Sequence, residues 1–393
     1  MDYLPREVLY LGPNTRVFAA VHPQSGEALA LKLAREEAPS EHRLDKLRHE
    51  HALLCELEMP GVIRVVDLQP QGAGLALVME RWGAGSLDKV LAQGPLPVET
   101  ALRLGAALSS VLGQVHRRGI IHRDVKPSNT LADKDLREVR LIDFGLAVRR
   151  GTYVSEKSAP EQLAGTLAFM APEQTGRMGR GVDSRADLYS LGVTLYQMLT
   201  GALPFETSDA LSLVHAQIAR TPPPPHERAP GQGVPEAVSA IVMKLMEKNL
   251  EARYQTAEGV IFDLERTAKE WHERGAVAPF ELGTHDWANR VRKASRLFGR
   301  EREVAELEGA LGRAASGAAE LLLVAGPSGV GKSALVGAVR AKVRECNAIF
   351  APGKLDQLQR GTPYFALSQA FRSIVRRRLA DPAPQLAWWK QAW

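Results

Sequence analysis

Residues 122–129 read "HRDVKPSN", and this octet is the most informative stretch of the 393-residue sequence. It places an acid, a lysine and an amide close together, at Asp124, Lys126 and Asn129. A predicted strand and "LIDFG", with Asp143, follow it, and "APE", with Glu173, follows later. The order and spacing of the three motifs are too specific for coincidence.

Upstream, two oppositely charged residues stand at positions expected to face the interior. Lys32 lies near the end of a predicted strand, in "ALALKL". Glu50 lies on a predicted helix over residues 41–57, three residues after Leu47 and four before Leu54, so it shares their inward face. The two residues are therefore expected to form an ion pair between strand and helix.

Through these motifs, residues 1 to about 270 resemble the eukaryotic-type serine/threonine protein kinases. The resemblance implies an α+β, bilobal protein-kinase fold, with a small β-rich lobe followed by a large α-helical lobe. It also implies transfer of the γ-phosphoryl group of ATP, with Mg²⁺, to Ser or Thr hydroxyls of a protein substrate. Such a reaction depends on positioning and charge neutralisation more than on covalent chemistry.

The same resemblance implies roles for single residues. Asp124 is the expected base for the substrate hydroxyl, and Asp187 the acid that supports the catalytic loop. Met79, as gatekeeper, Glu80 and Trp82 are expected at the adenine site. The other implied roles are charge neutralisation by Lys126, phosphate binding by Lys32 paired with Glu50, Mg²⁺ binding by Asn129 and Asp143, a buried ion pair between Glu173 and Arg253, and contact of Thr166 with Asp124 and Lys126.

The stretch "YLGPNTRV" aligns with the glycine-rich loop of the family but keeps one of three glycines. The family pattern is G-x-G-x-x-G-x-V with a lysine fifteen residues further on, the spacing of Val17 and Lys32. Tyr10, Gly12 and Thr15 then occupy the glycine positions. Gly12 keeps the backbone accessible to phosphate, and Val17 keeps the lid over adenine. We expect weaker ATP binding rather than lost catalysis.

A second nucleotide motif, "GPSGVGKS", fits G-x-x-x-x-G-K-[ST] fully. It follows a predicted strand, "LLLVA", and precedes a helix-like stretch, which is the context that a P-loop requires. With "LFGRERE" at 297–303, it resembles the start of AAA/STAND-type signalling ATPases. The expected phosphate-binding residues are Gly326, Gly329, Gly331, Lys332 and Ser333, with Ser333 also as a Mg²⁺ ligand.

The order of these parts resembles bacterial multidomain kinases, in which an ATPase follows a serine/threonine kinase. We expect a kinase domain at 1–270, a linker at 271–296 and the N-terminal part of an α/β P-loop domain at 297–393. The last part is expected to be truncated and incompletely folded, because no later apolar strand ends in an acid. Residues 221–233, "TPPPPHERAPGQG", are expected to be a loop, since four prolines disfavour helix and strand.

Composition limits which other functions and cellular locations are expected. The net charge of +5, from 50 basic and 45 acidic residues, is no signature of nucleic-acid binding. The cluster of Arg372 and residues 376–378 is interpreted as a solvated helix face, with nucleic-acid binding as the minor alternative. Cys55 and Cys346 exclude a disulfide framework, and no apolar run reaches the ~18 residues of a membrane span. A cytoplasmic protein without membrane contact is therefore expected.

Two alternatives remain. One is a pseudokinase, a nucleotide-binding scaffold that regulates the ATPase, and the degenerate loop is its support. The other makes the ATPase switch the main output and phosphorylation its input. Arg123 precedes the catalytic acid and can pair with a phosphate. Thr152, Ser155 and Ser158 are the candidate phosphorylation sites, including autophosphorylation.

Overall fold

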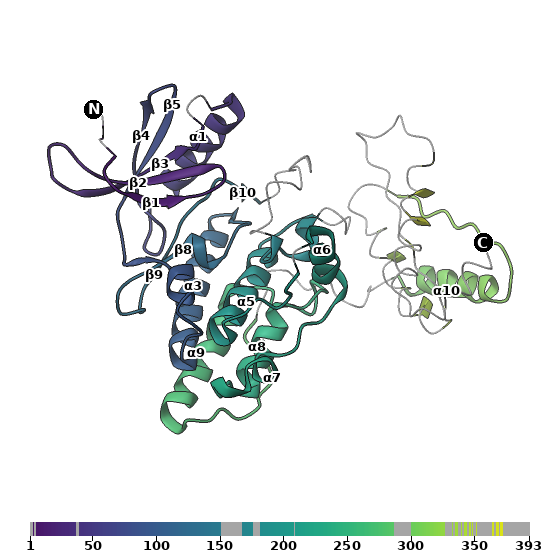
Figure 1. Ribbon diagram of the computed structural model, residues 1–393. Coiled ribbons are helices and arrows are strands. Elements are labelled where there is room, and N and C mark those ends of the chain that lie inside the picture. The colour runs from purple at the N-terminus through teal and green to yellow at the C-terminus, as the bar shows by residue number, and fades with distance from the viewer. Residues whose placement is uncertain are drawn as a thin grey trace. The chain divides into compact units, whose positions relative to one another are not determined.

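A computed structural model describes residues 3, 5–36, 39–150, 167–175, 181–207, 209–286 and 300–326, and single residues or pairs between 332 and 371 (Figure 1). The chain forms two compact units, Met1–Ala288 and Asn289–Trp393. No helix within the described ranges is long and apolar enough to cross a membrane.

The first unit opens with a five-stranded antiparallel sheet in the order β1-β2-β3-β5-β4. Helix α1 (Glu41–Glu56) packs against β4 and β5. It buries Leu47, Leu54 and Glu50, which confirms the inward position predicted for the glutamate. The strands are β1 (Val8–Leu11), β2 (Thr15–Val21), β3 (Ala28–Ala34), β4 (Val65–Gln71) and β5 (Gly74–Glu80).

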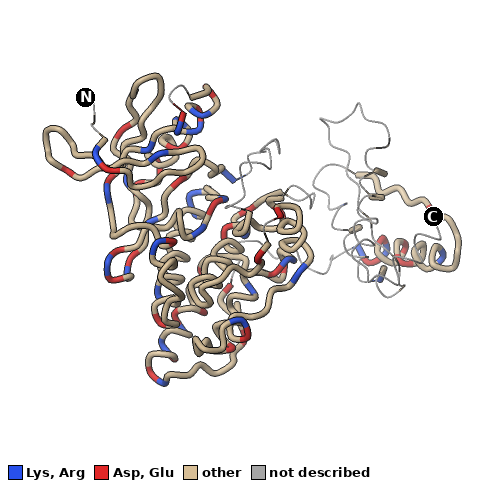
Figure 2. The backbone as a smooth tube through the Cα atoms, in the orientation of Figure 1, with Lys and Arg blue, Asp and Glu red and all other residues tan. Residues whose placement is uncertain are grey.

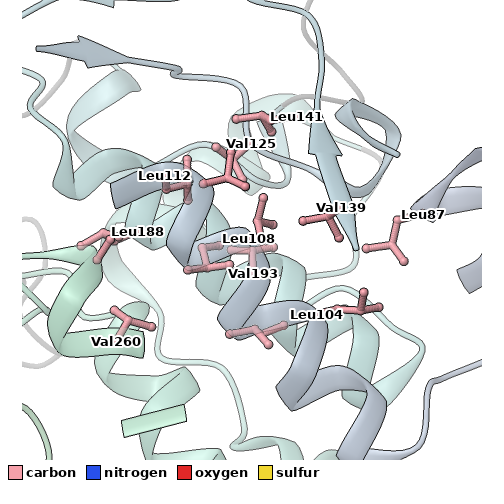
Figure 3. Close-up of a cluster of buried hydrophobic side chains, with 14 of the residues drawn as sticks. Leu87, Leu104, Leu108, Leu112, Val125, Val139, Leu141, Leu188, Val193 and Val260 are labelled. Carbon is pink, nitrogen blue, oxygen red and sulfur yellow. The ribbon is translucent and has the colours of Figure 1, made fainter. Parts of the chain in front are cut away.

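A helical lobe follows the sheet. Helix α3 packs against both α5 and α9, and Figure 3 shows Leu108 of α3 among Leu188, Val193 and Val260 from the other two. Helix α5 is buried on nearly every side, and its buried residues include the charged Arg185 and Asp187 as well as apolar ones. The helices are α2 (Leu87–Leu91), α3 (Val98–Arg117), α5 (Arg185–Thr200), α6 (Ala210–Ala219), α8 (Glu236–Leu245) and α9 (Ala257–Arg274).

Short strands frame the octet of residues 122–129. It lies between β7 (Ile120–Ile121) and β8 (Thr130–Ala132), and includes the 3-10 turn Pro127–Asn129. Strand β7 pairs with β10 (Val148–Arg149), while β8 lies between β6 (Gly85–Ser86) and β9 (Val139–Leu141). These pairings bring the octet beside the segment that follows β9.

Two expectations about secondary structure were wrong. The proline-rich loop contains a helical turn, α7 (Pro225–Arg228), and a 3-10 turn, Pro230–Gln232. Proline fits the first turn of a helix, where its missing N–H has no partner to lose. In the second unit, helix α10 (Glu301–Ala315) forms, but "LLLVA" is not a strand, and Leu321 is 86% exposed. A strand needs a hydrogen-bonded neighbour, and none forms among the described residues from 300 onward.

Charges of both signs are mixed over the described backbone of the first unit (Figure 2), in keeping with the near balance of the composition. The arginine cluster at 372 and 376–378 lies outside the described residues.

Residues 280–286, here called the C-terminal strap, return onto helix α9. Asp286 accepts hydrogen bonds from the N–H groups of Gln255 (2.6 Å) and Thr256 (2.9 Å) and from the Thr256 hydroxyl (2.7 Å). A Cβ atom at Gly259 would lie 2.6 Å from the Asp286 side chain, so only glycine allows this approach. The strap therefore holds the N-cap residue of α9, Thr256, whose hydroxyl accepts the Gly259 N–H at 3.2 Å.

We expect Asp286→Ala to destabilise the start of α9 by about 1–3 kcal/mol, because the N–H groups of Gln255 and Thr256 and the Thr256 hydroxyl lose their acceptor. Amide hydrogen exchange of α9 in the full-length protein measures the change. Asp209→Ala is the matched control, since Asp209 caps α6 through one exposed bond, to the Ser212 N–H (2.7 Å). Equal protection of α9 in both variants would contradict the capping role.

Candidate active site

The strand register aligns three expected site residues. Val17 of β2 lies opposite Lys32 of β3, and Tyr10 of β1 lies opposite Val17. Lys32 is 7% exposed although it carries a charge. The fifteen-residue spacing in the sequence thus corresponds to a direct cross-strand pair.

Lys32 lies between two carboxylates. Its Nζ donates to Oε1 and Oε2 of Glu50, at 2.8 and 2.7 Å, and to Oδ1 of Asp143 at 2.8 Å. Glu50 is buried, whereas 40% of the Asp143 side chain is exposed. The ion pair predicted from the sequence is therefore present, and it extends to the DFG segment.

The three groups shift one another's pKa values. Burial alone would lower the pKa of Lys32, but the charges of Asp143 and Glu50 raise it above its usual value. Burial raises the pKa of Glu50 to about 6, against the opposing charge of Lys32. Burial also acts to raise the pKa of Asp143, but the charge and hydrogen bond of Lys32 lower it to about 2. Asp143 is thus the firmly ionised member, and Glu50 is the one closest to protonation.

The catalytic loop is held by a carboxylate from α5. Asp187, fully buried, accepts hydrogen bonds from the N–H groups of His122 (2.9 Å) and Arg123 (2.7 Å). His116 Nε2 lies 2.8 Å from the same carboxylate. Arg123 has a φ of 67°, a region that residues other than glycine rarely occupy, so Asp187 stabilises a strained turn.

Within the loop, the Asp124 carboxylate accepts hydrogen bonds from two side chains. Lys126 Nζ donates to both of its oxygens, at 3.0 and 2.8 Å, and Asn129 Nδ2 donates to Oδ2 at 2.7 Å. Burial raises the pKa of Asp124, while Lys126 opposes that shift. The three expected residues of the octet therefore form one buried cluster.

His122 supports this cluster, and sequence reasoning gave it no role. Its Nδ1 accepts the Asp124 N–H (3.2 Å), so Nε2 carries the proton toward the Ile142 carbonyl (3.1 Å). Burial lowers the pKa of His122, which keeps this neutral form. Its ring also contacts the edge of Phe144, 4.6 Å between centroids. The presence of a histidine as the first residue of the octet was the sequence signal that could have indicated this role.

The residues expected at the adenine site lie at the end of β5 and just after it. Met79 is buried in β5, opposite Ala30, and Glu80 donates its N–H to the Arg64 carbonyl (3.0 Å). The Arg140 guanidinium lies over the Trp82 ring, 4.6 Å from the ring centroid. All three residues thus lie on one connecting segment.

The degenerate loop is tied at its tip. A Cβ atom at Gly12 would lie 2.6 Å from the Tyr10 ring, so this ring covers the remaining glycine. Arg35 donates to the Gly12 carbonyl (3.2 Å), and Arg43 of α1 donates to Asn14 Oδ1 (3.0 Å). Neither arginine was singled out from the sequence, because the contacts join distant segments.

A cavity of about 120 Å³ is lined mainly by β3, α1 and the segment after β9. Lys32, Arg43 and Lys46 bring positive charge to its wall, and Glu50 and Asp143 bring negative charge. Asn14 from the loop tip also lines the cavity. Phosphate groups suit such a site, because lysine and arginine offer charged donors to their oxygens.

Asn129 and Asp143 are compatible with a Mg²⁺ ion. Asp143 is anionic and partly exposed, and Asn129 uses its nitrogen, not its oxygen, toward Asp124. Oxygen ligands of this kind suit Mg²⁺, which usually completes its shell with phosphates and water. In the described ranges no cluster of three or more acidic, His or Cys side chains forms a metal site by itself.

A buried ion pair braces the large lobe. Arg253 Nη1 and Nη2 lie 2.7 and 3.2 Å from the two oxygens of Glu173, and both side chains are at most 1% exposed. Gln174, next to Glu173, donates to the Arg123 carbonyl (2.9 Å). The end of the APE segment is therefore joined to the catalytic loop.

In the second unit, Lys332 donates to the Gly326 carbonyl at 2.7 Å, which brings two P-loop residues together. Several other expected site residues lie outside the described ones, and their positions stay predictions. These are Thr152, Ser155, Ser158, Thr166, Gly329, Gly331 and Ser333.

Comparisons with known proteins identify both parts. The protein kinase domain family matches residues 6–261, and the AAA ATPase domain family matches residues 296–392. The chain is 33% identical over 244 residues to a probable serine/threonine-protein kinase of Clostridium perfringens (62% of this chain, 35% of the relative). It is 35% identical over 250 residues to the serine/threonine-protein kinase pkn2 of Myxococcus xanthus (63% and 30%).

A third similarity extends further along the chain. The hybrid signal transduction histidine kinase G of Dictyostelium discoideum is 26% identical over 382 residues, which cover 75% of this chain and 11% of that protein. The chain spans about a third or less of the length of these three relatives.

We expect activity to fall as the pH decreases through about 6, where Glu50 gains a proton and the Lys32 pair is lost. Below that pH, kcat/KM should decrease about tenfold per unit. Stability should not fall with it, because an acid whose pKa is raised on folding favours the folded state at low pH. Activity and unfolding are therefore measured together between pH 5 and 8.

Glutamine cannot be protonated in this pH range, so the activity of Glu50→Gln should be low and should not fall further as the pH decreases through about 6. Glu41→Gln, the same change at the exposed start of α1, should keep it. If the activity of Glu50→Gln still falls through about pH 6 as in wild type, the decrease arises from another group, such as Asp124.

We also expect replacement of Tyr10 and Thr15 by glycine to lower the KM for ATP about two- to fivefold with a smaller change in kcat, the pattern of altered ground-state binding. The physical reason is that the Tyr10 ring covers Gly12. Tyr10→Phe keeps the ring and should leave the KM unchanged. An unchanged KM in the double variant would show that both side chains point away from the phosphates.

Proposed function

Because this chain belongs to the protein kinase domain family, we propose that its first unit transfers the γ-phosphoryl group of ATP to serine or threonine hydroxyls of proteins, with an ATPase module following in the same chain. The observation that carries the proposal is the proximity of two charged clusters. The Ile142 N–H, next to Asp143, donates to the Asn129 carbonyl at 2.9 Å, and the charge of Asp143 adds to the effect of burial in raising the pKa of Asp124.

The proposal gives each cluster a task. Asp124 orients the substrate hydroxyl and accepts its proton, and burial, which raises its pKa, makes it a better base. Lys126 neutralises charge on the group in transfer, and Lys32 holds the phosphates. Mg²⁺, held by Asn129 and Asp143, would add positive charge against the phosphate oxygens.

Phosphorylation of the chain itself is part of the proposal. Arg123 Nε is buried and has no hydrogen-bond partner among the described residues, and burial lowers the pKa of this guanidinium. A phosphate at Thr152, Ser155 or Ser158 would supply a charged acceptor. A cytoplasmic location also stays a prediction, supported by two free cysteines.

The Tyr10 ring over Gly12 favours one alternative, a nucleotide-binding scaffold that transfers no phosphate. The two functions differ in a single measurable step. A scaffold would bind ATP and leave every hydroxyl unmodified.

We expect full-length wild type with radiolabelled Mg-ATP to phosphorylate itself and generic Ser/Thr substrates. Asp124→Asn and Lys32→Met should lose at least about 10²-fold in rate, because each removes a charge at the reacting groups. Asp135→Asn and Lys134→Met, the same changes at exposed positions of the β8–β9 turn, should retain it. ATP binding without any transfer by wild type would establish the scaffold, and labelled tyrosine alone would refute the Ser/Thr assignment.

A further inference from the structure

The contacts of Lys32 engage all the N–H donors of its ammonium group, which has three. Its Nζ bonds both oxygens of Glu50, at 2.8 and 2.7 Å, and Oδ1 of Asp143 at 2.8 Å. One lysine and two carboxylates together carry a net negative charge, which repels an anion. A phosphate group therefore needs further positive charge close to this cluster.

The backbone of the loop tip offers a phosphate group few donors. The Gly12 N–H donates to the Thr15 carbonyl at 2.9 Å, so it closes the turn between β1 and β2. Arg35 Nη1 donates to the carbonyl of the same glycine at 3.2 Å. A Cβ atom on Gly12 would lie 2.6 Å from the Tyr10 ring, so this ring covers the peptide as well. The one glycine that remains of the family pattern is thus engaged with the protein itself.

Helix α1 brings a guanidinium group to the loop tip. Arg43 Nη2 donates to Asn14 Oδ1 at 3.0 Å, and Arg43 Nε lies 3.1 Å from Oε2 of Glu36. The Arg43 side chain is 23% exposed, whereas that of Glu36 is 50% exposed. A guanidinium group has five N–H donors, so these two contacts leave donors for an anion. Arg43 can therefore bind a phosphate and keep its bond to the loop tip.

One cavity brings Arg43 and the Lys32 cluster together. Its wall includes three cations, Lys32, Arg43 and Lys46, and two carboxylates, Glu50 and Asp143. The added cations change the net charge of this set from negative to positive. The volume of about 120 Å³ is below the roughly 300–1,000 Å³ of a typical small-molecule pocket, so the cavity fits a phosphate group rather than a whole nucleotide. Lys46 is exposed, and Arg43 is the better shielded of the two added cations.

We propose that Arg43 binds the phosphate end of ATP and supplies there a contact that the backbone of the degenerate loop does not. This inference rests on the proposed function and deepens it, because it names a further ATP-binding residue of the same site. Arg43 and Glu50 lie about two turns apart on α1, so both face the cavity. ATP that contacts Arg43 favours the position of α1 in which Glu50 pairs with Lys32.

The test removes the charge of Arg43 in the full-length protein. Arg43→Gln keeps a side-chain N–H donor near Asn14 and loses the positive charge. We expect the KM for ATP to rise about tenfold, the loss of roughly one charge-assisted hydrogen bond, with a smaller change in kcat. Arg48→Gln is the matched control on the same helix, since Arg48 bonds the exposed Glu41 (2.5 Å) and Asp45 (2.8 Å). It should leave the KM for ATP unchanged.

Two comparisons separate the charge of Arg43 from its hold on the loop. Asn14→Ala breaks the bond to the loop tip but keeps the guanidinium group, so the KM for ATP should rise only about twofold. Adenosine has no phosphate, so its inhibition constant against ATP should be the same in Arg43→Gln as in wild type. An unchanged KM for ATP in Arg43→Gln, an equal rise in Asn14→Ala, or a parallel loss of adenosine inhibition would overturn the inference.

If wild type transfers no phosphate, the proposed function fails and ATP binding tests Arg43 by itself. The P-loop of the second unit is another expected ATP site, so every variant in this experiment also carries Lys332→Ala. Equilibrium dialysis with radiolabelled ATP or adenosine should show a Kd about tenfold higher in Arg43→Gln for ATP and an unchanged Kd for adenosine. Equal Kd values for ATP in Arg43→Gln and Arg48→Gln, or no binding of ATP without these changes, would overturn the role of Arg43.

Discussion

The carboxylate of Asp187 is the contact on which the site most depends. It lies at the start of a helix buried on nearly every side, and it accepts two backbone N–H groups of the catalytic loop. Burial would raise the pKa of Asp187, but the hydrogen bond and charge of His116 keep it lowered. An ionised acceptor can therefore stabilise the left-handed turn at Arg123, which places Asp124 against Lys126 and Asn129.

The electrostatic arrangement differs between the two lobes. In the large lobe, Glu173 is bound at both oxygens by Arg253, which also donates to the carbonyls of Glu247 and Arg185. Such a pair, fully buried and fully bonded, is costly to break. In the small lobe, Glu50 has a raised pKa and lies on a helix that also touches the loop tip through Arg43. The contact of α1 with the site thus depends on a carboxylate whose pKa is raised to about 6.

Local spacing predicted much of this site. The inward face of Glu50 followed from the helical repeat of Leu47 and Leu54, and the spacing of Val17 and Lys32 matched the strand register. Other features depend on rotamers and on distant segments, which spacing does not encode. The Tyr10 ring over Gly12 and the return of Asp286 onto α9 are of this kind. The helical turn at Pro225 was missed because proline was treated only as a helix breaker.

The strap is also bonded to the ion pair that braces the large lobe. Asp286 bonds the N–H groups of Gln255 and Thr256, and the Gln255 side chain accepts from Arg185 Nη1 at 2.9 Å. Arg185 in turn offers its carbonyl to Arg253, the partner of Glu173. The segment that leads out of the kinase unit is therefore bonded, through two residues, to the pair that braces the APE segment. Hydrogen bonds thus join the kinase lobe to Asp286, which lies beyond position 261, where the match to the kinase family ends.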